Sequence, residues 1–513
     1  MIRATTGGVL RSYRTNLMNS FIRDNKARET VLTQRIFNSY AEDPAAAAKA
    51  FRLRKSRMQA SSQLDVCRDA YYKYQGAHAC LQKVSELIDT ENGSDMATLK
   101  STTLEWLNDP TGDARTQLTK VLDNLSDTII QNMNQTYGDD FIFAGADGQN
   151  VPFEVKDVDG HKQLFYRGVP VDAAVPKVLE DGTGAAVKVN ADGEIDPAGE
   201  DYLSADAELT EVPQLVQDQG GKTLMVNANG DLTYDTTGTS YLLGDTPTLT
   251  QAEFDAAKAA GEDPNNFTSY TAADGTACFV RKSDIVSMSQ DEYQEIQNNA
   301  MTDTVTNQPY VLTKDGKDYY VTKSDDNVIT KADYDKACDD AEKLDYLAKE
   351  KRFVDIGLGL QEDENGKLIE SSAFNESING LTFLGYGLDE EGDPKNVYSI
   401  VQRLKEISES VPEGGSWGDG VYDQFHRLVG KLETAADKFK TQFTNQSAAT
   451  TKLENNVGLL EDNVYNLKEQ YSNLEDVNMA DAITSFIWAE YCYNAALKVG
   501  NSILSQSLMD YLQ

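Results

Sequence analysis

The chain has 513 residues, of which 40% are hydrophobic, and it carries a formal net charge of −36 from 47 basic and 83 acidic residues. A nucleic-acid-binding protein needs a basic surface, so this composition excludes nucleic-acid binding by the chain as a whole. The length indicates two to four domains, and the apolar content is sufficient for packed cores.

Basic residues concentrate near the start of the sequence. Residues 1–60 contain twelve Lys or Arg against four Asp or Glu, a local charge of +8, so the other 453 residues carry −44. In this stretch basic side chains alternate with apolar ones at a spacing compatible with a helix. That pattern favours a solvated or partner-facing helix over a nucleic-acid-binding arm.

Residues 1–42 are predicted to form the N-terminal helix of an inner, assembly domain. Leu10, Leu17 and Phe21 make a weak helical stripe that arginines interrupt. A helix with so narrow an apolar face is marginal alone, so we expect its partners to order it.

Residues 43–140 are predicted to form the N-terminal half of a helical rod. Asp43 can cap the free amides of a helix that begins at Pro44, because proline is tolerated at the first helical position. A second helix is expected over residues 113–137, with Gly138 as its C-cap. The stripe of the first helix contains Leu64, Tyr71, Tyr74, Leu81 and Ile88.

Residues 141–395 differ in pattern and are predicted to form a β-rich variable insert. Asp-Gly pairs recur there, and such pairs are typical of hairpin turns. Within residues 230–340 a unit of about 40 residues repeats three times. Each unit is expected to hold a hairpin (234–241, 270–279 and 310–320) and a capped short helix that begins after Thr250, Ser289 or Thr330.

Residues 396–478 return to the helical period and are predicted to form the C-terminal half of the rod. Apolar residues alternate at spacings of four and three, which is the heptad pattern of a coiled coil. We expect the stripe between Leu64 and Ile88 to be their partner, with the helix over 113–137 alongside. The heptad residues are Leu453, Val457, Leu460, Val464, Leu467, Tyr471 and Leu474.

Residues 479–513 are predicted to form the C-terminal helix of the assembly domain. Its apolar face is too broad for one partner, so several helices are expected to bury it, and we assign subunit contacts to it together with Leu10, Leu17 and Phe21. The residues on this face include Ile483, Phe486, Tyr493, Leu497, Ile503, Leu504 and Leu508.

Motifs for chemistry are weak in this sequence, and we predict no enzyme, no cofactor and no metal site. Residues 220–223 imitate half of a phosphate-binding loop, but Val216 stands where the first glycine is needed. Residues 361–372 imitate a calcium loop with Gln361 at its first position, and like the acidic run 389–393 they are interpreted as a solvated turn. The histidines are isolated.

The five cysteines, Cys67, Cys80, Cys278, Cys338 and Cys492, form no CxxC pair, so neither a zinc knuckle nor a small disulfide scaffold is indicated. No segment reaches the roughly 18 apolar residues of a membrane span. The first residues lack the apolar core of a cleavable signal peptide, and general rules alone predict a cytosolic protein.

Two groups of residues carry a resemblance to a known family. Residues 453–457, 473–482, 495–500 and 507–512 resemble the C-terminal helices of bacterial flagellins. Residues 35–38, 42–46, 137–145 (which include Phe-Ile-Phe-Ala-Gly) and 152–153 resemble the hook-associated protein 3 branch, the flagellin-like subunits that join hook to filament. The match covers roughly residues 1–153 and 396–513, whereas the insert matches nothing.

The resemblance implies an α+β multidomain protein whose long terminal helices pair as a coiled-coil bundle around a β-rich inserted domain. It also implies an extracellular flagellar location, export through the flagellar secretion system without a cleaved signal peptide, and a structural role in motility. The implied partners are a ring of identical subunits, hook-associated protein 1, flagellin, and an export chaperone on the C-terminal helices. Neither nucleic acid nor membrane insertion is implied.

Two alternatives remain open from the sequence. A filament-forming flagellin shares the same chain ends, although it less often has the Phe-Ile-Phe-Ala-Gly and Pro-Phe pair. The second alternative is a flagellin-like protein with a binding or enzymatic domain in the insert. The five cysteines and the polar breaks in the first helix depart from the family pattern, and they bear on how tightly the terminal helices pair.

Overall fold

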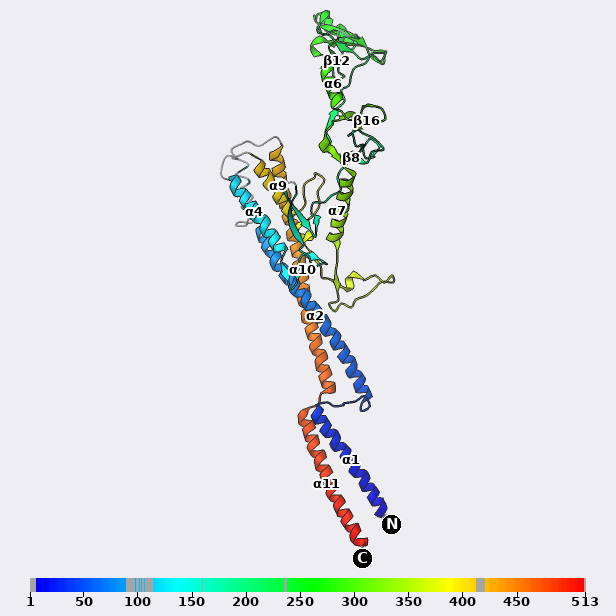
Figure 1. The fold of residues 1–513 in the computed structure, drawn as a ribbon, viewed down its shortest axis with the longest axis vertical. Coiled ribbons are helices and arrows are strands. Elements are labelled where there is room, and N and C mark those ends of the chain that lie inside the picture. The colour runs from blue at the N-terminus through cyan, green and yellow to red at the C-terminus, as the bar shows by residue number, and fades with distance from the viewer. Residues whose placement is uncertain are drawn as a thin grey trace. The chain divides into compact units, whose positions relative to one another are not determined.

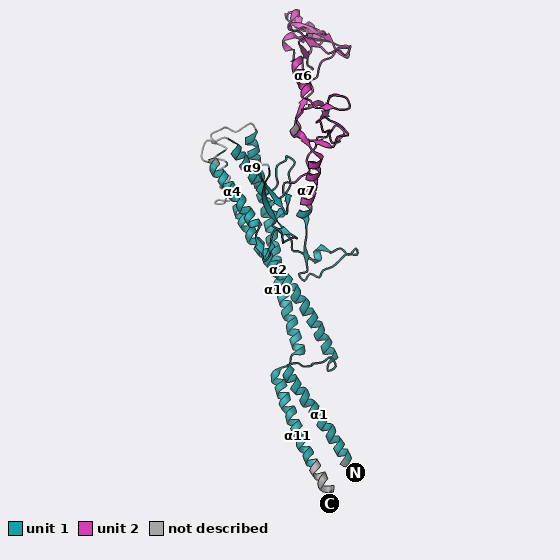
Figure 2. Ribbon diagram, in the orientation of Figure 1, with its two compact units in different colours: residues 1–172, 346–513 teal, residues 173–345 magenta. Residues whose placement is uncertain are grey.

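The computed structural model describes residues 6–88, 97, 101, 103, 106, 114–158, 160–234, 238–411 and 420–511. The chain divides into two compact units, residues 1–172 with 346–513 and residues 173–345 (Figure 2). Long helices dominate the first unit and small antiparallel sheets the second, so the protein is α+β as expected.

Helices make most of the first unit (Figure 1). They are α1 (Thr6–Thr33), α2 (Pro44–Leu87), α4 (Ala114–Met133), α8 (Gly380–Leu384), α9 (Val397–Ser410), α10 (Val421–Glu475) and α11 (Met479–Tyr511). Its strands are β1 (Thr136–Tyr137), β2 (Asp140–Phe141), β3 (Ala144–Gly145), β4 (Phe153–Val158), β5 (His161–Tyr166), β6 (Val169–Pro170), β21 (Phe353–Val354), β22 (Phe374–Asn375) and β23 (Ile378–Asn379).

The start of α2 follows the local chemistry of its first residues. The Asp43 side chain accepts hydrogen bonds from the backbone amides of Ala45 and Ala46, and Pro44 occupies the first turn. These contacts satisfy amides that have no partner inside the helix. The predicted cap is confirmed.

Helices α2 and α10 form an antiparallel rod. Gln446 donates a hydrogen bond to the carbonyl oxygen of Tyr74 at 2.7 Å, and the Cys67 thiol lies 3.9 Å from the carbonyl oxygen of Leu453. Further along, the Arg54 guanidinium lies 5.3 Å from the ring centre of Tyr471.

This register differs from the one that we expected. Most heptad residues of α10 lie opposite the first half of α2. There Tyr471 and Leu474 pack on Ala47 and Ala50, and on Phe37 in the segment before α2. Because the two helices are antiparallel and α10 begins at Val421, the first half of α10 faces the second half of α2 instead. Spacing within one helix reveals its apolar face, but not the position of its partner along the chain.

Helices α1 and α11 also pair antiparallel. The Phe21 and Tyr493 ring centres lie 5.6 Å apart, and the Tyr13 hydroxyl donates to the carbonyl oxygen of Ala496 at 3.2 Å. At the other end of the pair, backbone hydrogen bonds join residues 34–36 to residues 475–477. The helix α1 is shorter than the predicted stretch 1–42, because an irregular segment follows Thr33.

Helix α4 ends earlier than expected. It stops at Met133, and Gly138 is therefore not its C-cap. Gly138 instead occupies the turn between β1 and β2 with a backbone φ of +61°, a conformation that glycine adopts without strain. Gly138 therefore marks a turn between two strands and not the end of a helix.

The boundaries of the β-rich region also differ from the predicted 141–395. Residues 141–172 and 346–395 belong to the helical unit, where β3 pairs with β23. Phe143 and Tyr166 are fully buried in that unit. Gly-rich and Asp-rich composition marks turns, and turns occur on both sides of a domain boundary.

The described residues of the second unit form short strands, three α-helices and short 3-10 helices. The strands are β7 (Lys188–Val189), β8 (Asp201–Leu203), β9 (Leu209–Glu211), β10 (Met225–Val226), β11 (Leu232–Thr233), β12 (Ser240–Leu242), β13 (Phe267–Thr271), β14 (Ala277–Arg281), β15 (Ser287–Ser289), β16 (Thr302–Asp303), β17 (Gln308–Pro309), β18 (Val311–Lys314), β19 (Lys317–Val321) and β20 (Val328–Ile329). The helices are α5 (Gln251–Ala259), α6 (Gln290–Asn299) and α7 (Lys331–Lys349), the last of which continues into the first unit.

The repeat within this unit is present in part. The hairpins β13–β14 and β18–β19 form as predicted, and Thr250 and Ser289 each make a complete capping box. The hairpin expected over 234–241 is wrong, because β11 and β12 both pair with β10 and not with each other. In the third unit the Thr330 hydroxyl accepts a hydrogen bond from the backbone amide of Asp333 at 3.1 Å, so the second and third units keep both the hairpin and the capped helix.

Candidate functional site

The pair of α1 and α11 buries only part of its apolar surface. Leu10, Leu17, Phe486 and Tyr493 are half-buried between the two helices. Two helices can cover one stripe on each other, and the remaining apolar residues must face away.

Those remaining residues are exposed apolar side chains along the two helices, and we call them together the terminal-helix surface. The Trp488 side chain is 64% exposed and the Tyr491 side chain 68% exposed, and their rings meet edge to face at 6.3 Å. Exposed apolar residues gathered in this way mark a protein interaction site or a groove for a partner. The members are Val9, Met18, Phe21, Ile22 and Leu32 on α1, with Ile483, Ile487, Trp488, Tyr491, Leu497 and Val499 on α11.

Three of the predicted assembly residues, Phe21, Ile483 and Leu497, are exposed members of this surface. The side chains of Ile503, Leu504 and Leu508 lie outside the described residues. The exposed Trp488 and Tyr491 were not among the predicted site residues, although their aromatic character signals an interface.

The residues that we predicted to join the two halves of the rod are the stripe of α2 and the heptad residues of α10, and we call them the seam. They lie inside the rod. Six of them are buried: Leu64, Tyr74, Leu81, Ile88, Leu453 and Leu460. The others, Tyr71, Val457, Val464, Leu467, Tyr471 and Leu474, are half-buried. The seam is therefore driest in the middle of α10 and wetter toward its C-terminal end.

Two of the cysteines are part of this packing. Cys67 and Cys80 are buried free thiols, and burial raises the pKa of both, so they stay protonated and unreactive. Cys278 and Cys338 are free and partly exposed, and Cys492 is free and exposed on α11.

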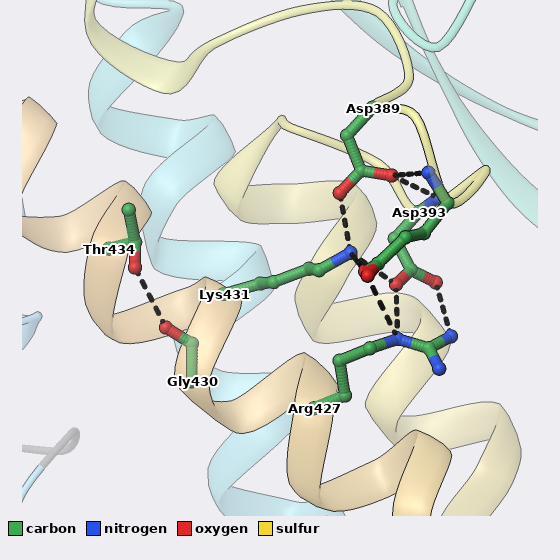
Figure 3. Close-up of polar contacts among 7 residues, drawn as sticks. Asp389, Asp393, Arg427, Gly430, Lys431 and Thr434 are labelled. Carbon is green, nitrogen blue, oxygen red and sulfur yellow. Dashed lines mark hydrogen bonds and ion pairs between the residues drawn. The ribbon is translucent and has the colours of Figure 1, made fainter.

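A second polar feature is the acidic turn over residues 389–393. Lys431 of α10 donates hydrogen bonds to the carboxylates of Asp389 and Asp393 at 2.5 and 2.6 Å, and Arg427 donates to Asp393 at 2.7 Å (Figure 3). The interpretation of this turn as solvated is wrong for Asp393, which is 5% exposed. Both cations come from the second and third turns of α10. This contact could not be predicted, because the turn and α10 are far apart in the sequence.

The charges of this turn and of α10 compensate one another. Burial alone would raise the pKa of Asp393, but the hydrogen bonds from Arg427 and Lys431 outweigh it and lower that pKa. Burial would likewise lower the pKa of Lys431, but its hydrogen bonds with Asp389 and the other carboxylates raise it. The carboxylate oxygens of Asp389, Glu391 and Asp393 lie within 4.8 Å of one another around the Lys431 ammonium group. The cluster therefore works as an ionic clasp that holds the turn against α10.

The two segments that imitate ligand loops are simple turns. Asp218 accepts hydrogen bonds from the backbone amides of Gly220 and Lys222, and Asp363 accepts from those of Asn365 and Lys367. Side-chain acceptance of this kind stabilises a turn locally. Among the described residues no helix is long and apolar enough to cross a membrane.

Comparisons with known proteins complete this description. No protein-family model matches the chain, and no curated protein matches it. Among solved structures, FlgL from Xanthomonas campestris is 12% identical, with 82% of this chain and 99% of that chain covered at a TM-score of 0.29.

Two structures from Legionella pneumophila give similar values. The flagellar junction protein FlgL is 12% identical over 83% of this chain and 99% of that chain, with a TM-score of 0.27. The structure described as flagellar hook-associated protein 3 is 12% identical over 81% and 98%, with a TM-score of 0.28. Values this low do not establish a family for the chain.

Proposed function

We propose that this protein is a structural subunit of the bacterial flagellum that joins hook to filament as a ring of identical copies. The observation that carries the proposal is the terminal-helix surface, an apolar face on the two chain ends that resemble the flagellin family. The proposed activity is assembly, and no reaction is assigned to the chain.

Burial of the terminal-helix surface would supply the free energy of assembly. Each Å² of apolar surface removed from water contributes about 25 cal/mol, and aromatic side chains at the centre of an interface contribute most. Trp488 and Tyr491 expose roughly two thirds of their surface in the isolated chain, so their burial would contribute the most free energy to assembly. Neighbouring copies, hook-associated protein 1 and flagellin are the proposed partners.

A junction subunit is favoured over a filament-forming flagellin by the segment over 141–145. Ile142, Phe143 and Ala144 are buried, and Phe153 packs on Tyr166 with ring centres 5.0 Å apart. The Tyr166 hydroxyl also donates a hydrogen bond to the carbonyl oxygen of Phe143 at 3.1 Å, so the two motifs that resemble the junction subunits meet in one core, and we assign them the same structural role. Filament formation stays as the alternative outcome of the tests.

Export is proposed to use the flagellar secretion channel, with a chaperone covering α11 before assembly. An exposed apolar helix of this kind would otherwise aggregate in the cell. The extracellular location at the hook–filament boundary follows from the proposal.

The location can be tested by labelling detached flagella with an antibody against residues 173–345. We expect a narrow band at the hook–filament boundary, because only a ring of subunits is needed there. Label along the whole filament, or long filaments formed by the purified protein alone, would favour flagellin. A strain that lacks the protein should keep its hooks and release flagellin into the medium, and full filaments in that strain would contradict the proposal.

The role of the terminal-helix surface can be tested with Trp488→Asp. We expect at least a tenfold loss of assembled protein on isolated hooks, because a charge in the centre of an apolar interface must be desolvated. Thermal melting should be unchanged, because the Trp488 side chain is 64% exposed in the isolated chain.

The matched control is Asn494→Asp, which adds the same charge to an exposed position of α11 without removing apolar surface. It should assemble much more strongly than Trp488→Asp. Equal assembly by Trp488→Asp and the unmodified chain would exclude the terminal-helix surface from the junction.

A further inference from the structure

We call the segment of the rod formed by residues 44–64 of α2 and 453–475 of α10 the lower rod. In this segment one helix carries mainly basic residues and the other mainly acidic ones. Residues 44–64 of α2 contain five basic residues and no acidic one. Residues 453–476, the end of α10 together with Asp476 that follows it, contain six acidic residues and one lysine. The two stretches lie opposite each other in the antiparallel pair, so one flank of this rod segment is basic and the other acidic.

Only part of this charge is used within the chain. Arg54 lies 3.4 Å from Glu475, and Arg68 lies 2.6 Å from Glu461. In the part of the chain that the structure describes, Arg52, Lys55, Asp462 and Glu469 make no ion pair and are exposed. Their charges are therefore available to a partner.

Each flank also exposes large apolar side chains. On α2, Phe51 and Met58 are both 66% exposed, and on α10, Leu459 and Tyr465 are 68% and 66% exposed. These side chains interrupt rows of charged residues. A row of alternating charged and apolar side chains on an exposed helix face is typical of a helix that packs on another helix.

The helical period places these residues on single faces. Residues 51, 55 and 58 are spaced by four and three, and so are residues 462, 465 and 469, so each set projects from one side of its helix. We call Phe51, Arg52, Lys55 and Met58 the basic flank, and Leu459, Asp462, Tyr465 and Glu469 the acidic flank.

We propose that the basic flank of one copy packs against the acidic flank of α10 in the neighbouring copy. The charges are opposite and the apolar residues recur at similar intervals, so a second copy of this chain fits each flank. Such a contact joins different surfaces of the two copies, and contacts of that type close into rings or continue as helical arrays. This inference rests on the proposed function, because it presumes that copies stand side by side.

The flanks complement the terminal-helix surface in a physical sense. Apolar burial at α1 and α11 supplies affinity but little orientation, whereas charge pairs at an interface fix register and partner choice. Exposed ion pairs contribute only about 0.2–1 kcal/mol each and weaken with salt. The flanks would therefore set how neighbouring rods align.

Charge reversal tests this contact. One variant carries Arg52→Glu and Lys55→Glu, and the other carries Asp462→Lys and Glu469→Lys. The assembled fraction of each variant alone should fall at least tenfold at low ionic strength, because like charges then face each other between copies. Since these residues make no ion pair with a described residue, the melting temperature should stay close to that of the unmodified chain.

An equimolar mixture of the two variants makes the test specific. Both flanks of the first variant are acidic and both flanks of the second are basic, so copies can alternate and assembly should return. Failure of the mixture to assemble would overturn the inference. Sedimentation velocity measures the assembled fraction, and added salt should weaken the mixture and the unmodified protein alike.

Two controls separate this inference from the proposed function. Lys331→Glu with Lys336→Glu makes the same change in net charge as Arg52→Glu with Lys55→Glu, but at exposed positions of α7, and should assemble normally. If Trp488→Asp abolishes assembly but neither reversal variant does, the flank contact is wrong and the proposed function stands. If the unmodified protein forms no oligomer alone or on isolated hooks, both are wrong.

Discussion

At the scale of single residues, two carboxylates of the helical unit have opposite environments. Asp393 receives hydrogen bonds from Arg427 and Lys431, which lower its pKa although burial opposes them. Asp172, two residues after β6, has an Oδ1 atom that is inaccessible and has no hydrogen-bond partner among the described residues. Burial raises the pKa of Asp172 to about 6, against the smaller opposing effect of the Ser399 hydroxyl.

Asp172→Asn should stabilise the protein at neutral pH. A carboxyl group with a raised folded-state pKa contributes stability below the unfolded value of 3.8, and that contribution is lost as the pH rises toward 6. The asparagine carries no charge, so the gain should be roughly 1–3 kcal/mol near pH 8 and close to zero near pH 3. Thermal melting across this range measures it.

The matched control is Asp139→Asn, which removes the charge of an exposed carboxylate in the same unit. It should change the melting temperature little at any pH. A Tm of Asp172→Asn that follows the unmodified chain at every pH would show that the Asp172 carboxylate is hydrated in solution.

Asp393→Asn should have the opposite sign. Because the folded-state pKa of Asp393 lies below its ordinary value of 3.8, its stabilisation is present above that value and is lost as the pH falls through the folded-state pKa. We expect a loss of about 1–3 kcal/mol at neutral pH, and a smaller loss in acid. Glu391→Gln is the control, because the Glu391 side chain is 61% exposed and its ion pair with Lys431 is weak in water. Equal losses for the two variants at neutral pH would contradict the ionic clasp.

At the scale of elements, α10 shows how one helix separates folding from assembly. Leu460 is 7% exposed and packs toward Gly357, whereas its neighbour Leu459 is 68% exposed. Successive residues on a helix differ by about 100° in direction, so adjacent leucines can serve different surfaces.

Leu460→Asp should unfold the lower rod, because the new carboxylate would be buried without a partner at a cost of several kcal/mol. Leu459→Asp should leave the fold intact, with an unchanged melting temperature, and weaken the flank contact between copies. Circular dichroism at the melting transition and sedimentation together separate the two effects. Equal melting temperatures for the two variants would contradict the assignment of Leu460 to the seam.

At the scale of the whole molecule, the two compact units have separate cores. One core of the second unit gathers Leu203, Met301, Leu312 and Val321, all 2% exposed or less. The helical unit has its own, which includes Phe143, Phe425 and Phe439. Units with separate cores can respond separately to a change in one of them.

Removal of residues 479–513 should therefore abolish assembly and leave the second unit folded. Hydrogen exchange of residues 173–345 measures this, and protection there should match the full chain. Loss of protection throughout 173–345 in the truncated protein would show that the units fold as one.

Much of the local structure was predictable from residues close in sequence. The Asp43 cap, the capping boxes at Thr250 and Ser289, and the break after Glu475 all depend on contacts within a few residues. The apolar stripes of the helices were predictable for the same reason, because the period of a helix can be detected within a single segment. The role of Gly138 was missed because a glycine with positive φ serves helix ends and turns equally.

Contacts between distant segments were not predictable in the same way. The register of α2 on α10, the pairing of β3 with β23 and the clasp between Asp393 and Lys431 all join segments whose separation along the chain is set by packing. The exposure of Trp488 and Tyr491 was not predictable either. An apolar helix face has the same sequence pattern whether its own chain or another chain covers it.

Patterns within the sequence were enough to predict the long terminal helices, the cap of α2, the change to short strands between these helices, and the segregation of charge. The packed structure was needed to show which halves of α2 and α10 meet and which apolar residues stay exposed to water. The physical reason is that secondary structure depends on periodicity and hydrogen bonds within a segment, whereas register and exposure depend on the total fit of all segments at once.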